Sequence, residues 1–332
     1  MVKKYLLSLL NLLLLLTLLS CGKPAEQKRE DAVLSANIML STRQCQAAID
    51  LLEGVGRDTY DGKYMATLAS AYACKAGFTE PRFFVDELPK IGTPGGLGGL
   101  TRFTLASSMT SPTADSFVNL QKAIDVLLYA GGVSSTSEPT AANRALGLSS
   151  VDAQNINAQL MYLVLTQMGL YLNYYGNSSS TGVKGSGTGT NSCIVNYNGA
   201  TTLNVGTNLT TYFGTNVTGA CKLAGLGTTG HPQLGVTASL NVARLCQGSV
   251  LLNTFIDLFP SVLASITTND LSTVDGITAA INLAKTAVTT AKTDASMATL
   301  MNTLNQANCV ANNTDTQYLQ VYFAFMYEVL LQ

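Results

Sequence analysis

Histidine, cysteine and paired carboxylates are the side chains that could do chemistry in this chain of 332 residues. There is one histidine, His231, and there are seven cysteines. A Ser-His-Asp triad would need His231 as its base, but no Gly-x-Ser-x-Gly motif supplies a nucleophile and no Ser-x-x-Lys with Lys-Thr-Gly combination is present. A histidine-rich zinc site is excluded. Because His231 precedes Pro232 in a polar segment, the sequence favours a solvated loop residue, with a general base or lone ligand as the alternative.

Paired carboxylates are the remaining enzymatic option. Asp50 with Glu53, and Asp58 with Asp61, lie on predicted amphipathic surfaces or in turns, where solvation and helix capping favour a structural role over acid/base work on a glycoside. No acidic cluster resembles a calcium-binding loop. The sequence therefore assigns no catalytic residue, no metal ligand and no cofactor.

The N-terminal residues have the pattern of an export signal. Lys3 and Lys4 precede an apolar run from Leu6 to about Leu19, which is too short for a stable membrane span. The order ending in Leu18-Leu19-Ser20-Cys21 resembles a bacterial lipoprotein precursor. An ordinary secretory signal with an accidental cysteine is the alternative.

The lipoprotein resemblance implies that residues 1–20 are removed and that Cys21 is acylated. Two or three acyl chains would then hold the protein on the membrane. Gly22, rather than an aspartate, follows Cys21. In enterobacterial members of the class this favours the outer membrane, on its periplasmic or surface face.

The other six cysteines are an even number in an exported chain, which predicts three disulfides. None shows the two-residue spacing of a zinc ribbon or a redox motif. Six cysteines permit 15 connectivities, and we favour sequential pairing because each bridge would then close a supersecondary unit. The predicted pairs are Cys45–Cys74, Cys193–Cys221 and Cys246–Cys309.

Composition limits the class of protein. Charged residues make up 12% of the chain and the net charge is −1, so no basic surface is available for nucleic acid. The hydrophobic share of 47% predicts a packed core rather than disorder.

Apolar spacing at three and four residues predicts a mainly helical fold, either a bundle or an irregular array. The segment 160–172 is apolar nearly all round and should be buried at its centre, with Tyr171, Tyr174 and Tyr175 as a packing cluster rather than a sugar or peptide platform. The glycine run 92–100 is predicted to be a hinge or loop, not a phosphate cradle. The predicted helices lie near 33–40, 48–52, 61–76, 83–88, 117–127, 150–175, 240–259, 274–291 and 315–331.

Two neighbouring hairpins resemble a known repeat. ANIMLSTRQCQAAIDLLEGV followed by YMATLASAYACKAGF is similar to a degenerate tetratricopeptide unit that runs into the next, with an offset of about 33 residues. The resemblance implies a helical segment that contacts another protein. It is carried by Met39, Ala48, Leu68, Ala69, Tyr72 and Gly77.

Residues 177–236 are rich in Gly, Ser, Thr and Asn and contain no amphipathic stripe. We expect an insertion with short strands, pinned by one disulfide. The predicted organisation is a signal peptide (1–20), a lipidated tether (21–31), a helical region (32–176), the insertion (177–236) and C-terminal helices (237–332) that pack with the first helices as one domain.

The predicted function is a non-catalytic interaction or scaffold module of the cell envelope. Its partners would be the membrane, through the acyl chains, and another envelope protein. Two alternatives remain open, an envelope hydrolase acting on glycan or peptide and a lipoprotein that binds a small ligand.

Overall fold

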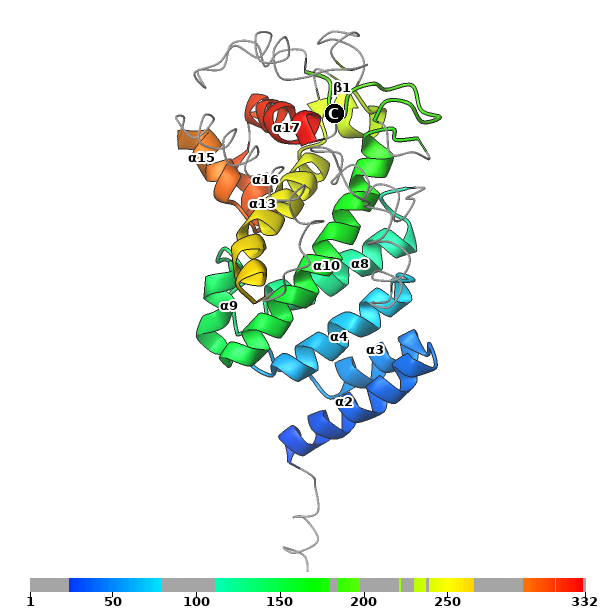
Figure 1. Cartoon of the computed structure of the whole chain (residues 1–332), viewed down its shortest axis with the longest axis vertical. Coiled ribbons are helices and arrows are strands. Elements are labelled where there is room, and N and C mark those ends of the chain that lie inside the picture. Colours follow the sequence, from blue (N-terminus) through cyan, green and yellow to red (C-terminus); the bar gives the residue numbers. More distant parts are fainter. Residues whose placement is uncertain are drawn as a thin grey trace, which may run out of the picture.

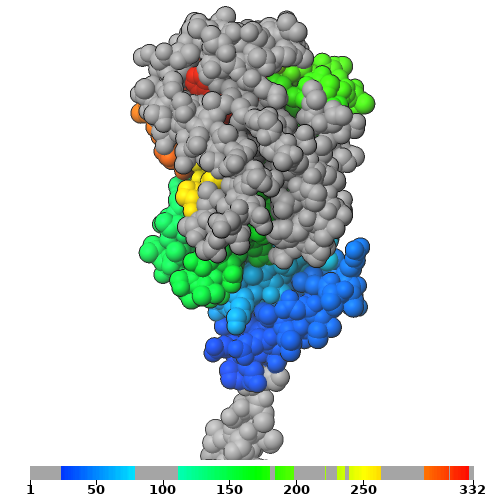
Figure 2. Space-filling model, in the orientation of Figure 1, coloured from blue at the N-terminus to red at the C-terminus, as the bar shows by residue number. Residues whose placement is uncertain are grey.

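The chain folds into a mainly helical structure, as predicted. The computed structural model describes residues 24–78, 111–179, 184–197, 221, 230–236, 239–265, 295–313 and 315–330. The helix α2 lies at one end of the long axis and α17 lies near the other (Figure 1). In the space-filling view the N-terminal helices form the lower end of the molecule (Figure 2).

The helices α2 (Ala25–Ser41), α3 (Cys45–Gly54) and α4 (Gly62–Lys75) pack on one another. The side chain of Asp61 caps α4 by accepting a hydrogen bond from the backbone N–H of Tyr64 at 3.0 Å. The α4 helix ends in a Schellman motif, in which Gly77 has a φ of 82° and Phe78 N–H donates to the carbonyl of Ala73. The Cys45–Cys74 disulfide joins the start of α3 to the end of α4.

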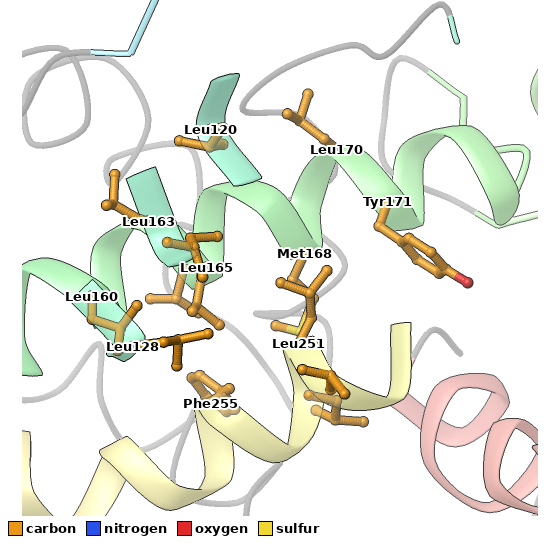
Figure 3. Packing of buried hydrophobic residues seen from close by; sticks show 14 of the residues in the cluster. Leu120, Leu128, Leu160, Leu163, Leu165, Met168, Leu170, Tyr171, Leu251 and Phe255 are labelled. Carbon is orange, nitrogen blue, oxygen red and sulfur yellow. The ribbon is translucent and has the colours of Figure 1, made fainter. Parts of the chain in front are cut away.

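The long helix α10 (Ser150–Tyr175) is the centre of the fold, and α8 (Asp115–Leu128) and α13 (Val242–Ser265) both pack on it. Ser149 caps α10 by accepting from Asp152 N–H at 3.1 Å. Residues of all three helices meet in the core, where the side chains of Leu128, Leu165 and Phe255 point toward one another (Figure 3). The predicted burial of 160–172 is confirmed for all but one of its side chains, Tyr162, which is half-buried.

The remaining helices α9 (Ala141–Gly147), α15 (Ala295–Asn302), α16 (Gln306–Asn312) and α17 (Thr316–Leu330) pack around α10 and α13. The 3-10 turn η4 (Pro232–Leu234) leads into β1 (Gly235–Val236), which pairs antiparallel with β2 (Ser239–Leu240). The disulfide Cys246–Cys309 joins α13 to α16. All three disulfides follow the predicted sequential pairing.

Proline does not end α13. The sequence places the helix end at Phe259, but α13 continues through Pro260 to Ser265. An interior proline costs about 3 kcal/mol because it removes a backbone hydrogen bond. Val262 in the last turn is buried, and its packing offsets part of that cost.

The predicted tether over 21–31 is too long at its C-terminal side. The α2 helix begins at Ala25, and Ala32 is already buried in the core. Arg29 forms an ion pair with Asp58 at 2.8 Å. These contacts hold residues 25–31 on the helical domain, so an irregular tether cannot extend beyond Pro24.

The segment 177–236 is not a separable insertion. Ile194, Val195 and Tyr197 are at most 1% exposed and belong to the main hydrophobic core. Glu328 of α17 accepts hydrogen bonds from Ile194 N–H at 2.8 Å and from the Tyr197 hydroxyl at 2.7 Å. Local sequence pattern misses this burial because residues 191–197 enter the core in irregular backbone, which has no periodicity.

Several predictions fall outside the described residues. They concern the signal peptide with Cys21, the helices near 83–88 and 274–291, and the glycine run 92–100. Among the helices that the structure describes, none combines the length and hydropathy needed to cross a membrane.

Candidate functional site

His231 caps a turn rather than standing in solvent. It is half-buried against the rings of Tyr174 and Tyr175, whose centroids lie 4.8 and 5.0 Å from its own. Its Nδ1 accepts a hydrogen bond from Gln233 N–H at 3.2 Å, and burial lowers the pKa of its imidazole. The predicted loop position is confirmed, but the ring is half-buried rather than fully solvated. The contacts with Tyr174 and Tyr175 could not be predicted from local sequence, because these residues are far from His231 in the chain.

The predicted carboxylate pairs have structural partners. Asp50 accepts from Gln46 at 2.7 Å, whereas Glu53 accepts from Arg57 Nε at 2.9 Å and from the Tyr72 hydroxyl at 3.0 Å. The hydrogen bond from Arg57 lowers the pKa of Glu53. Asp58 and Asp61, already described, pair with an arginine and cap α4.

The three tyrosines at the end of α10 are a packing cluster. Tyr171 is fully buried, with its ring 4.5 Å from that of Tyr175 and 5.9 Å from that of Tyr327. Its hydroxyl donates to the backbone carbonyl of Arg244 at 3.0 Å. Burial raises the pKa of this hydroxyl well above its ordinary value. These contacts bind α10 to α13 and α17 and leave no open ring face on Tyr171.

One group of metal-ligating residues is already occupied. Cys193, Cys221 and Glu328 place their ligand atoms within 4.8 Å of one another. The cysteines form a disulfide, and Glu328 is ion-paired with Lys184. With its thiols oxidised and its carboxylate paired, this group serves folding.

A cavity of about 460 Å³ lies between α8 and α13. It exists because both helices pack on α10 and scarcely on each other. Its volume falls within the range of small-molecule sites, ~300–1,000 Å³. The apolar part of its wall is formed by Ile124, Leu128, Val250, Leu251 and Leu304.

A directed chain of hydrogen bonds crosses the polar wall of this cavity. Arg244 Nη1 donates to Gln247 Oε1 at 3.2 Å, and Gln247 Nε2 donates to Gln121 Oε1 at 3.4 Å. Gln121 Nε2 in turn donates to Asp125 Oδ1 at 3.0 Å. The chain starts at a guanidinium on α13 and ends at a carboxylate on α8, so the cavity carries a positive and a negative charge on one wall.

Asp125 is an unusual wall residue. Its side chain is exposed to solvent and lines the cavity. Desolvation raises the pKa of its carboxyl group, against smaller lowering effects of the hydrogen bond from Gln121 and the charge of Arg57. Its Oδ2 accepts no hydrogen bond from the residues that the structure describes.

A second unsatisfied group lines the same cavity. Thr254 is 1% exposed, and its Oγ1 has no hydrogen-bond partner in the described part of the chain. A buried hydroxyl without a partner costs about 1–3 kcal/mol. Such a group is explained if a ligand supplies the missing partner.

A second cavity, of about 450 Å³, lies between α2, α4 and α10. Its wall includes Gln159, but the amide of this residue donates to the Ala66 carbonyl at 3.1 Å and to Ser70 Oγ at 2.9 Å. Polar groups already paired within the protein do not call for a ligand. The cavity between α8 and α13 is therefore the better candidate site.

None of the polar cavity residues was singled out from the sequence. Gln121 and Asp125, four residues apart, look like the solvated face of an amphipathic helix, as do Arg244 and Gln247, three residues apart. Only the placement of α8 and α13 on the same side of α10 brings the two polar faces together. Comparison of the chain with protein-family models, with curated proteins and with solved structures gives no match.

Proposed function

We propose that this protein is a lipid-anchored protein of the cell envelope that binds a small ligand in the cavity between α8 and α13. The observation that carries the proposal is the hydrogen-bonded chain from Arg244 to Asp125 along the cavity wall. It fixes two opposite charges and two amides around an apolar volume, which is the usual composition of a ligand site.

The site favours binding over catalysis. Among the described residues, Asp125 forms a hydrogen bond with the amide of Gln121 and with no other carboxylate or imidazole. The lone histidine is engaged with η4 and the α10 tyrosines. Anchoring rests on the lipoprotein-like order of residues 1–21.

The test is to recover what the protein carries. The full-length protein is expressed in an envelope-competent bacterial host, purified in mild detergent and denatured, and the released small molecules are measured by mass spectrometry. We expect a molecule that is present with wild type and with Lys122→Trp but reduced at least tenfold with Gln121→Trp. Gln121 lines the cavity, whereas the neighbouring Lys122 is exposed on α8.

Both variants introduce a tryptophan on α8, at adjacent positions. A difference between them therefore reports cavity occupancy rather than stability. Thermal melting of both variants checks that each is folded. Equal recovery of the molecule from both folded variants, or no released molecule at all, would contradict ligand binding in this cavity.

A role as an interaction module is the second candidate, because α2 exposes apolar side chains. Leu34 and Ile38 are 66% and 63% exposed and lie one helical turn apart. A photo-crosslinker at Ile38 should capture an envelope protein in living cells, whereas one at exposed Lys28 on the same helix should not. Identical patterns from the two positions would argue against this surface as an interface.

A further inference from the structure

The two charges of the cavity lie at opposite ends of its polar wall. In Figure 3, α8 runs from Leu120 to Leu128 and α13 runs from Leu251 to Phe255 toward the same side, while α10 runs the other way. The two glutamines that meet between the helices fix their register. On α13, Arg244 lies one turn before Gln247, and on α8, Asp125 lies one turn after Gln121. Along the helix axes, Arg244 and Asp125 are therefore about seven residues apart, which is roughly 10 Å.

Both charged groups keep bonding capacity for a ligand. The guanidinium of Arg244 uses Nη1 on Gln247, which leaves further N–H donors of its planar group, and the described residues offer it no carboxylate. Asp125 keeps Oδ2. Asp125 is exposed and Arg244 is half-buried, so both charges are accessible and a ligand with two opposite charges can pair with both.

The spacing selects the length of the ligand. A free α-amino acid carries both charges on one carbon, which is too short for a wall of this length. An extended peptide advances ~3.3–3.6 Å per residue, so two or three residues cover about 7–11 Å. Its backbone amides would meet the amides of Gln121 and Gln247, each of which keeps one N–H and one acceptor lone pair beyond its bonds in the chain.

Resting on the ligand-binding function above, we propose that the cavity binds a zwitterionic peptide of two or three residues. Its ammonium group contacts Asp125, its carboxylate contacts Arg244, and its small apolar side chains contact Ile124, Val250 and Leu251.

The experiment is isothermal titration calorimetry of the full-length protein in detergent with tri-L-alanine and tri-L-leucine. Each peptide is also used with an acetylated amine and with an amidated carboxyl group. We expect the free peptide to bind and each cap to weaken binding at least tenfold. The capped ligands act on the wild-type protein, so this readout does not depend on how any variant folds.

Two variants assign the ends of the peptide. Asp125→Asn should weaken the free peptide and remove the penalty of the acetyl cap while keeping that of the amide, and Arg244→Gln should do the reverse. Asp50→Asn and Lys28→Gln, exposed on α3 and α2, should match wild type. Caps without effect, or penalties that persist in both variants, would overturn the peptide assignment.

The outcome also separates this inference from the proposed function. If neither tripeptide binds but a molecule is still released from wild type and lost with Gln121→Trp, the cavity binds a ligand of another class. The peptide assignment is then wrong and ligand binding stands. If no molecule is released and neither peptide binds, both proposals fail.

Discussion

Lys184 and Glu328 form an ion pair that is almost sealed from solvent, with side chains 5% and 0% exposed. The pair joins the Gly- and Ser-rich segment to the last helix, α17. The carboxylate of Glu328 also accepts from Ile194 N–H and from Tyr197. One buried side chain therefore holds three residues of this segment, Lys184, Ile194 and Tyr197, all of which lie in irregular backbone.

Breaking this pair should be costly. In Lys184→Met the Glu328 carboxylate stays buried without its cation, and we expect the free energy of unfolding to fall by about 3–5 kcal/mol. Urea denaturation followed by circular dichroism measures the change, with exposed Lys28→Met as control. The double variant Lys184→Met with Glu328→Gln should recover part of the loss. A single-variant effect below 1 kcal/mol would show that the carboxylate is not sealed.

Replacement of residues 177–236 by a short Gly/Ser linker should abolish cooperative melting. The core would lose Ile194, Val195 and Tyr197 together with the partners of Glu328. Thermal melting at 222 nm, compared with a linker of equal length appended after Gln332, decides the matter. Retained cooperativity would restore the interpretation of this segment as an insertion.

The six cysteines of the described domain should be oxidised. Thiol labelling in denaturant without reductant is expected to modify none of Cys45, Cys74, Cys193, Cys221, Cys246 and Cys309. The Cys246–Cys309 bridge spans 63 residues, so its removal as a double Ser variant should cost roughly 4 kcal/mol in the loop-entropy description. If two of these six thiols are labelled when the non-reduced protein is denatured, one of the three bridges is absent.

Asp125 should make stability depend on pH. Desolvation by the surrounding protein raises the pKa of its carboxyl above the ordinary value of 3.8, so the folded protein holds this proton more tightly than the unfolded chain. Stability contributed by Asp125 therefore falls as pH rises through the window above 3.8. Arg57, Gln121 and Tyr129 face or influence this group and are unchanged in the test.

The measurement is urea unfolding of wild type and Asp125→Asn between pH 3 and pH 7. The variant should gain stability relative to wild type as pH rises, because asparagine carries no charge to desolvate. Asp50→Asn, on the exposed surface of α3, serves as the control. Parallel curves for wild type and Asp125→Asn would mean that the carboxylate is solvated as in the unfolded chain.

Cys21→Ser should abolish acylation, because this thiol is the only attachment point in the proposed lipoprotein signal. We expect the variant to leave the detergent phase in Triton X-114 partitioning, either unprocessed or released. The control is the double variant Cys45→Ser with Cys74→Ser, which removes a disulfide and keeps Cys21. This control should still partition with detergent. A Cys21→Ser protein that partitions like wild type would end the anchoring proposal.

Helix spacing predicted most of the fold. The stripes of α8 and α10 and the capping role of Asp61 depend on residues within one or two turns, so local pattern is sufficient. The burial of Ile194 and Val195 depends on α17, more than a hundred residues away, and leaves no local trace.

The candidate site was less accessible to sequence reasoning than the fold. Gln121 and Gln247 contact each other only because α8 and α13 share α10 as a common support. Before that arrangement is known, each is an ordinary polar residue on an amphipathic helix. Asp125 likewise becomes unusual only when α13 closes the space opposite it.

The early start of α2 has a consequence for how far the domain can travel. Three residues separate Cys21 from Ala25, and this connection spans at most about 14 Å when fully extended. Under the proposed acylation, the α2 end of the long axis would stay close to the lipid headgroups, while α17 would lie near the far end (Figure 1). Such a protein would not shuttle cargo across the envelope. It would diffuse within the plane of the membrane and exchange ligand with other proteins in the same leaflet.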